Sequence, residues 1–144
     1  MDIFEWDENI PVTANNLNEM QNILNQNILD EFNNRSKILW TNLDPTSNFN
    51  AQTITLNENL DNYDSYEILA LQSTAAARIV STGRIPVGHG CFLMQGPSRR
   101  PSEDTINGTT IYFEDCRSIF PPDYSIINEQ MIPMYVIGYK TELF

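Results

Sequence analysis

The sequence predicts a mainly β protein in which a jelly-roll-like β-sandwich head follows an N-terminal α-helix. Three observations predict this fold class. Apolar residues between positions 13 and 34 recur every three or four positions, the period of an amphipathic helix. From residue 36 the apolar period changes to two and the apolar segments become short. Asparagine is concentrated in the first 62 residues, with only Asn107 and Asn128 beyond Asn62. The predicted divisions are an arm at 1–12, a helical oligomerisation stem at 13–34 and a β head at 36–144.

The stem segment, PVTANNLNEMQNILNQNILDEFN, reads as one helix with Thr13 as its N-cap. An isolated helix of this length is marginal in water, so its apolar stripe requires a cover. Ile23 and Leu29 flank the stripe and widen it, which favours a three-helix bundle, and therefore a homotrimer. Gln21 falls inside the stripe, where a polar residue specifies register and oligomer state. The alternative is that the helix packs on its own domain. The predicted oligomer interface consists of Leu17, Met20, Leu24, Ile28 and Phe32.

The head segment contains six short apolar runs typical of strands: QTITL, YEILAL, ARIV, CFLM, TTIYF and MYVIGYK. Before them, Leu39 and Trp40 end a first strand, and Phe49 in the following loop is expected to pack back on the core. Stretches such as STGRIPVGHG and QGPSRRPSED are typical of turns. The runs YEILAL and MYVIGYK are apolar on both faces, whereas a sandwich strand exposes one face to solvent. Their second face is expected to contact a neighbouring chain or, alternatively, a long covering loop.

Charge and cysteine content limit the partners and the compartment. The net charge of −11 and the pI near 4.2 argue against nucleic acid, because neutralising phosphates requires clustered Lys and Arg. The segment MDIFEWDENIP carries acids and no base, which is not the positive n-region of a signal peptide, and no run has the length of a membrane span. We therefore expect synthesis in a cytoplasm without membrane insertion. Cys91 and Cys116 are expected to be buried free thiols rather than a disulfide.

The sequence contains no recognisable reaction centre, so we expect no enzymatic activity, no metal and no cofactor. His89, Cys91 and Cys116 give three soft ligands, one short of a closed tetrahedral zinc site. A catalytic zinc with water in the fourth position fits this count, but the glycines of GHGC more simply describe a turn into a strand. A Cys–His nucleophilic pair is disfavoured because strand alternation buries the thiols, and buried thiols are inert.

Two carboxylate pairs, Glu103–Asp104 and Glu114–Asp115, are the residue type that a glycosidase needs. Adjacent residues of a strand point to opposite faces, so the run FEDC is expected not to place both carboxylates in one site. A Gly-rich phosphate loop of the P-loop or Rossmann type is also missing from the sequence. These observations disfavour glycoside hydrolysis and nucleotide chemistry.

Binding is favoured over catalysis, because many amphipathic rings are available for stacking against sugars. In an all-β fold such rings more often belong to the core or its rim, so no receptor-binding residue is assigned. Arg99 and Arg100 stand out in an acidic chain, but Pro97 and Pro101 flank them, and a solvated loop is expected there. The rings belong to Trp40, Tyr63, Tyr66, Tyr112, Tyr124, Tyr135 and Tyr139.

The stretches LWTNLDPTSNFNAQTITL, YDSYEILAL and IPMYVIGYK together resemble the small β domains of tail-fibre, baseplate and related virion proteins of tailed phages. The resemblance is strongest to phages that infect low-GC Gram-positive bacteria. Upstream, ENIPVTANNLNEM is similar to the I-T-A-x-N-L-N helix start that precedes such domains in phage structural proteins. The resemblance extends from about Glu8 to Lys140.

The resemblance implies a trimeric virion component with a helical stem and a globular head. Host-surface or glycan attachment is expected as a second property. The expected partners are further copies of the chain, other virion proteins and a host cell-surface glycan. A capsid decoration or head-fibre protein remains an alternative, as does a carbohydrate-binding module unconnected with virions, which would not need the helix. In the arm, Ile3, Phe4 and Trp6 are expected to dock on another virion protein, because large apolar residues suit a free tail poorly.

Overall fold

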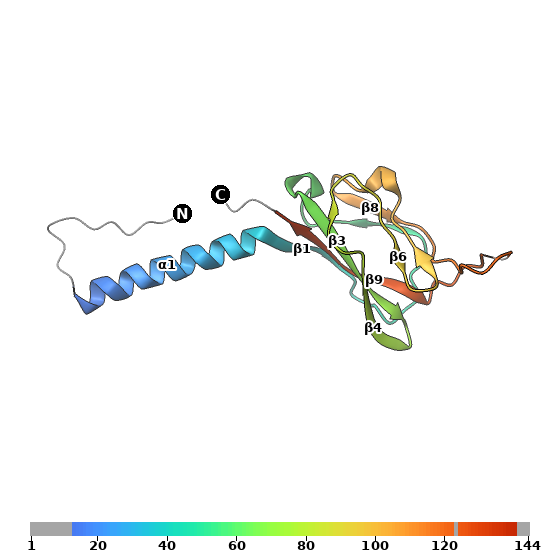
Figure 1. Cartoon of the computed structure of the whole chain (residues 1–144), viewed down its shortest axis with the longest axis horizontal. Helices are drawn as coiled ribbons and strands as arrows, with labels where there is room; N and C mark the ends of the chain where they lie inside the picture. The colour runs from blue at the N-terminus through green and yellow to red at the C-terminus, as the bar shows by residue number, and fades with distance from the viewer. Residues whose placement is uncertain (1–12, 123, 141–144) are drawn as a thin grey trace.

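The protein is mainly β, with one N-terminal helix that projects from a head of antiparallel strands (Figure 1). The computed structural model describes residues 13–122 and 124–140; the predicted docking residues Ile3, Phe4 and Trp6 lie outside this part. The helix is α1 (Ala14–Arg35). The strands are β1 (Ser36–Thr41), β2 (Gln52–Thr55), β3 (Ser65–Ser73), β4 (Ala76–Ser81), β5 (Ile85–Pro86), β6 (Leu93–Met94), β7 (Ser98–Arg99), β8 (Thr110–Phe113) and β9 (Gln130–Tyr139). Two short 3-10 helices span Leu60–Asn62 and Glu103–Thr105.

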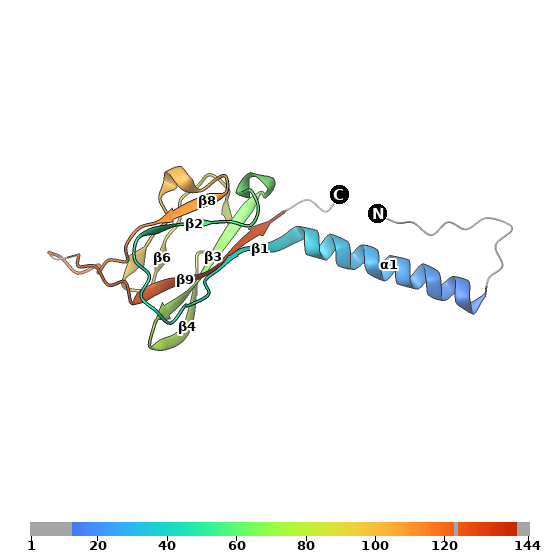
Figure 2. The ribbon, with the colours of Figure 1, turned by 180° about the vertical axis from the view of Figure 1, so that it is seen from behind.

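The helix begins and ends where the sequence predicts. The Thr13 Oγ1 accepts a hydrogen bond from the Asn16 backbone N–H at 3.2 Å, so Thr13 is the N-cap. At the other end Ser36 is extended (φ −141°, ψ 140°), and the chain passes directly into β1. The Lys140 N–H donates to the Arg35 carbonyl at 2.7 Å, which ties the end of the helix to the end of β9. Figure 2 shows the consequence from behind: α1 continues the direction of β1 away from the head.

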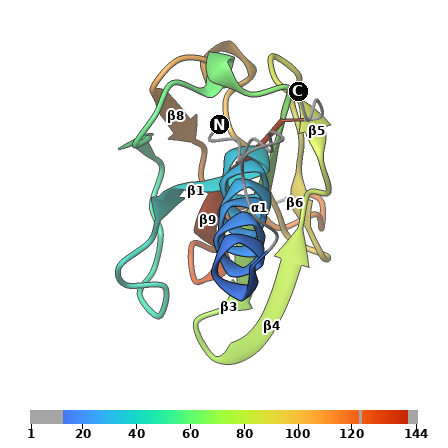
Figure 3. The ribbon, with the colours of Figure 1, turned by 90° about the vertical axis from the view of Figure 1, so that its left-hand side faces the viewer.

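The strands form one large and two small antiparallel sheets. In the large sheet the order is β1-β9-β3-β4, with β5 paired to β3. The small sheets are β2-β8 and β6-β7, and the bridges Ser98↔Arg117 and Pro101↔Phe113 connect the β7 segment to the β8 segment. Viewed from the helix end, β8 and β4 lie on opposite sides of the head, with α1 in front (Figure 3).

The large and small sheets share one hydrophobic core. Buried side chains of the large sheet, including Ile68 and Val136, belong to one cluster with Ile54, Ile111 and Leu93 of the small sheets. The cluster also contains Leu39, Phe49, Leu56, Leu60, Tyr63, Tyr66, Ala70, Cys91, Ile106, Phe113, Cys116, Met131 and Ile132. A cluster of this size is enough to stabilise a domain of about 100 residues.

Two details of the core bear on later arguments. Phe49 is buried, as predicted, and its ring makes edge contacts with Trp40 and Phe113 at centroid distances of 6.2 and 5.7 Å. Gly138 of β9 lies against the Tyr63 ring, where an added Cβ would be 2.7 Å from Tyr63 Cγ and 2.9 Å from Leu39 Cδ1. Glycine at position 138 therefore lets the strand approach the core closely.

The outer face of the large sheet is apolar and partly exposed. Along β3, Ile68 and Ala70 are buried, whereas the intervening Leu69 is only half-buried. Leu69 pairs with Tyr135 across the β3-β9 ladder, and paired residues point to the same face. Further apolar residues of this face are Ile38, Ile79 and Ile137, of which Ile38 and Ile79 are exposed. The two-faced apolar character expected from YEILAL and MYVIGYK is thus present in β3 and β9.

Strand bounds differ from the predicted runs, most clearly at three points. The run CFLM contributes only Leu93–Met94 to β6, because Cys91 and Phe92 precede the short ladder with β7. The strands β5 and β7 have two residues each, too few for a period to be read from sequence. The strand β9 begins at Gln130, before the predicted run MYVIGYK starts at Met134, although Pro133 lies within the strand. Within the described residues, no helix is long and apolar enough to cross a membrane.

Candidate functional site

The stem carries an exposed apolar stripe. Leu17, Leu24 and Ile28 are 45%, 48% and 65% exposed on a helix that projects away from the head (Figures 1 and 2). Leu29 beside them is exposed as well, and Met20 is half-buried. The side chain of Phe32 lies outside the described part of the structure. The spacing of Leu17, Met20, Leu24 and Ile28 on one continuous helix places these four residues on one side of α1. The head of the same chain leaves Leu17, Leu24 and Ile28 in contact with solvent.

The two thiols are buried, whereas the His89 side chain is exposed. Cys91 and Cys116 are both free and buried. The Tyr66 hydroxyl donates to the His89 carbonyl at 2.6 Å and lies 3.3 Å from Cys91 Sγ. Burial raises the pKa of the Cys91 thiol and raises the pKa of Cys116 to about 11. Among the side chains that the structure describes, no three of His, Cys, Asp or Glu are grouped so that they could hold a metal ion.

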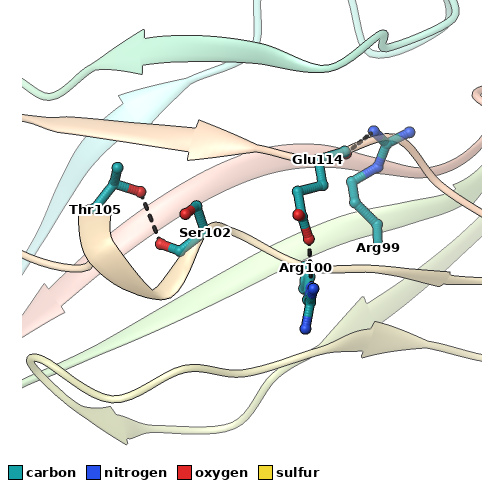
Figure 4. Close-up of polar contacts among 5 residues, drawn as sticks. All are labelled: Arg99, Arg100, Ser102, Thr105 and Glu114. Carbon is teal, nitrogen blue, oxygen red and sulfur yellow. Dashed lines mark hydrogen bonds and ion pairs between the residues drawn. The ribbon is translucent and has the colours of Figure 1, made fainter.

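Arg99 is a buried structural residue, and the expectation of a solvated loop is wrong for it. It belongs to β7 and is 1% exposed, whereas its neighbour Arg100 is exposed. Figure 4 shows the two side chains leaving adjacent residues in different directions. Alternation along an extended segment explains the difference, because successive side chains point to opposite faces. Pro97 and Pro101, on which the loop prediction rested, do not indicate that the side chains between them alternate.

The Arg99 guanidinium binds four acceptors from two separate segments. Its Nε donates to the Met131 carbonyl at 2.8 Å, and its Nη1 donates to the Glu114 carbonyl at 2.9 Å. Its Nη2 donates to the Gln130 carbonyl at 3.1 Å and to Asn128 Oδ1 at 3.4 Å. Desolvation lowers the pKa of Arg99 to about 10, so the side chain is still charged at pH 7. Arg99 thus ties the start of β9 to the segment after β8.

Asn128 extends this network towards the surface. Its Oδ1 also accepts from the Cys116 backbone N–H at 2.9 Å, and its Nδ2 donates to Asp115 Oδ1 at 2.8 Å. The Asp115 carboxylate accepts a second hydrogen bond from the Ala51 N–H at 2.9 Å. Hydrogen bonds from Asn128 and Ala51 lower the pKa of Asp115 below its ordinary value. The orientation of Asp115 is therefore fixed by the framework behind it.

A surface cleft of about 400 Å³ lies in front of this framework. Four separate segments contribute to it: the start of β2, the residue before β6, the β7 segment, and β8 with the residues after it. The rings of Phe92 and Tyr112 form two of its walls, and these residues are 56% and 38% exposed. The cleft, called the β8 cleft below, is lined by Ala51, Phe92, Ser98, Arg100, Tyr112, Glu114, Asp115 and Arg117.

The β8 cleft brings together two carboxylates that strand alternation was expected to separate. β8 ends at Phe113, so Glu114 and Asp115 follow the strand, and both line the cleft. The expectation from FEDC is wrong for this reason. Glu114 Oε2 accepts from Arg100 Nε in a close ion pair (Figure 4). A smaller cavity of about 240 Å³, lined by Arg100, Ser102, Glu103 and Glu114, adjoins the cleft through this pair.

A second hollow of similar volume offers less to a ligand. It lies between Trp40 and the loop that follows β1. Several of its polar side chains are engaged internally: Asn42 Nδ2 donates to the Pro133 carbonyl, and Asp44 accepts from the hydroxyls of Thr46 and Ser47. The Trp40 ring makes an edge contact with Phe49 and a tilted contact with Phe113, whose ring centroid lies 6.3 Å away. The β8 cleft is therefore the better candidate for a binding site.

The chemistry of the β8 cleft favours binding over hydrolysis. Glycoside hydrolysis needs one carboxylic acid that is protonated near neutral pH. Hydrogen bonds lower the pKa of Asp115, so this carboxyl group is not a proton donor near neutral pH. Glu114 accepts a hydrogen bond from Arg100 in an ion pair, and the cleft combines donors and acceptors around two aromatic rings. Comparison of this chain with family models, curated proteins and solved structures finds no match.

Proposed function

We propose that the protein is a structural component of a bacteriophage virion, a homotrimer in which α1 forms a three-stranded stem and the strands form a β-sandwich head. The observation that carries this proposal is the exposed stripe of Leu17, Leu24 and Ile28 on a helix that leaves the head. Burying one such side chain fully stabilises by about 1.5–3 kcal/mol relative to exposure, so association of stems is favourable. The resemblance of the head segments to virion β domains supplies the context.

The outer face of the large sheet supports the same assembly. Ile38 lies in β1, directly after the stem, and its partner Ile137 continues the apolar face onto β9. Exposed apolar patches rimmed by polar residues mark interaction surfaces. Copies that associate through their stems bring their heads near one another, so this face is available for contacts between heads.

Attachment to a host surface is the second part of the proposal, and the β8 cleft is its candidate site. A carbohydrate-binding module unconnected with virions would share the cleft, but it would gain nothing from a projecting amphipathic stem. Catalysis is not part of the proposal, because the two cleft carboxylates are held as acceptors.

Location in the particle tests the proposal. Antibodies raised against the head are expected to label purified particles from the cells that carry the gene, and immunogold electron microscopy shows where. Label on the tail or baseplate supports the appendage assignment, and label over the capsid supports a decoration or head-fibre protein instead. Particles free of the chain would contradict a virion role. The arm is tested in the same assay: a version lacking residues 1–12 is expected to be lost from particles while remaining trimeric.

A further inference from the structure

We propose that the β8 cleft binds a neutral saccharide of two or more units, stacked on Phe92 and Tyr112 and held by the charged side chains between them. The cleft supplies the attachment site in the proposed function, but saccharide binding itself does not depend on where the protein lies in a particle. The site combines rings, donors and acceptors in one concavity, and each part restricts the class of ligand.

The rings indicate a ligand with apolar faces. Phe92 precedes β6 and Tyr112 lies in β8, and both line the same cleft although large rings gain nothing from solvent. A pyranose presents a face of C–H groups that packs on an aromatic ring, and its hydroxyls extend at the edge. Amphipathic aromatic side chains suit such a ligand because they combine apolar area with a polar edge.

The polar side chains indicate a ligand with many hydroxyls. Towards the described residues, Arg100 uses only Nε, and Arg117 uses only Nη1, which donates to the Tyr124 carbonyl at 3.3 Å. Glu114 Oε1 and Asp115 Oδ2 likewise make no hydrogen bond to the described residues. The cleft therefore offers several guanidinium donors and two carboxylate acceptors side by side. A hydroxyl group both donates and accepts, so a polyol can use both kinds of group.

Charge favours a neutral ligand over an anionic one. The two arginines and two carboxylates of the cleft cancel formally, and the chain as a whole has a net charge of −11. A phosphate-bearing or carboxylate-bearing polymer would be repelled by the overall field and would meet no surplus of cations in the cleft. A neutral sugar meets neither obstacle.

Length follows from the adjoining cavity. The cleft of about 400 Å³ and the cavity of about 240 Å³ share Arg100 and Glu114, so the ion pair lies between them. Ligand sites commonly have volumes of about 300–1,000 Å³, and the two spaces together fall well inside this range. A linear oligosaccharide can therefore occupy both, with the Arg100–Glu114 pair beneath the linkage.

Saturation-transfer-difference NMR on the full chain tests the proposal. The probes are neutral di- and trisaccharides of glucose, galactose, mannose and N-acetylglucosamine, with glycerol phosphate as the anionic probe. We expect transfer to the ring C–H protons of at least one neutral saccharide. Phe92→Ala and Tyr112→Ala are expected to weaken its binding by about three- to tenfold, the range for loss of one stacked ring. Phe120→Ala is the matched control, because Phe120 is equally an exposed phenylalanine but lies outside the cleft.

Each outcome decides the assignment. Weaker saccharide binding by Phe92→Ala and Tyr112→Ala, with binding by Phe120→Ala unchanged, supports the assignment. The assignment would be overturned if no neutral saccharide showed transfer, or if all three variants gave equal signals. It would also be overturned by stronger transfer to glycerol phosphate than to any neutral saccharide. Because Phe92 and Tyr112 are exposed, thermal unfolding of the variants is expected to match the unsubstituted protein. Sedimentation and particle labelling do not depend on saccharide binding. If saccharide binding fails, the virion assignment is therefore still tested by particle labelling.

Discussion

Replacing Arg99 by alanine is expected to destabilise the head strongly, whereas the same change at Arg100 is not. The Arg99→Ala variant loses three hydrogen bonds of 2.8–3.1 Å to the carbonyls of Glu114, Gln130 and Met131, and a longer one to Asn128. Each acceptor left unpaired in the interior costs about 1–3 kcal/mol. The three shorter bonds alone therefore predict a loss of at least about 3 kcal/mol.

Two further effects act on this value. Arg99 is the largest fully buried side chain, so its truncation also leaves a cavity, while removing a desolvated charge returns part of the loss. We expect a net decrease of about 3–5 kcal/mol in the free energy of unfolding, a large fraction of the 5–15 kcal/mol typical of a domain. Arg100 is exposed and pairs with Glu114 in solvent, so Arg100→Ala should change stability little.

Urea unfolding followed by tryptophan fluorescence measures the difference, because Trp40 packs on Phe49, over whose ring the Arg99 guanidinium lies at 5.3 Å. All variants are compared at one protein concentration, since association contributes to apparent stability. Arg99→Lys is a second variant, in which a single ammonium is expected to satisfy fewer acceptors than the planar guanidinium. Equal midpoints for the alanine variants at 99 and 100 would refute the reasoning.

Three other predictions follow from the packing and protonation of the head. Gly138→Ala is expected to cost about 1–3 kcal/mol because an added Cβ would overlap the ring behind it, whereas Gly90→Ala would meet only a flexible glutamate side chain; equal urea midpoints would contradict this. Cys91 and Cys116 are expected to resist a thiol reagent at pH 8 in the folded protein, since about one Cys116 thiol in a thousand is ionised at that pH. Both are expected to react fully after denaturation without reductant, and rapid labelling of the folded protein would contradict their burial. The pKa of Asp115 is lowered in the folded protein, so its stabilising contribution is complete above its ordinary pKa of 3.8 and is lost as the pH falls through the lower folded value. Asp115→Asn should therefore make the dependence of stability on acid pH shallower. An unchanged dependence would count against the Asn128 contact.

Local signals predicted the helix and most strands because these elements are set by short-range patterns. The cap at Thr13 and the stripe from Leu17 onward lie on one continuous helix, which ends at Arg35 where the period changes. Phe49 was predictable because a lone large aromatic in a polar loop gains most by packing on the adjacent core. Strands of two residues, such as β5 and β7, carry too little sequence to show a period.

The β8 cleft and the Arg99 network could not be read from the sequence, because both depend on long-range pairing. Arg99 meets acceptors that follow it by 15 to 32 positions, so its burial becomes visible only once β9 is placed. Glu114 and Asp115 share a site because β8 ends one residue before them, and strand ends are poorly defined by alternation. Phe92 and Tyr112 became candidates for ligand contact only when the fold placed them in one concavity.

Sedimentation of the intact protein tests the central claim, that α1 is an oligomerisation stem, most directly. At micromolar concentration we expect a species of three times the 16.5 kDa chain mass. Leu24→Asp places an unpaired charge in the apolar stripe, at a cost of several kcal/mol per complex, and is expected to give monomers. Asn22→Asp adds the same charge on the polar side of the helix and should leave the trimer intact. A monomer from the unsubstituted protein, or trimers from Leu24→Asp, would contradict the account.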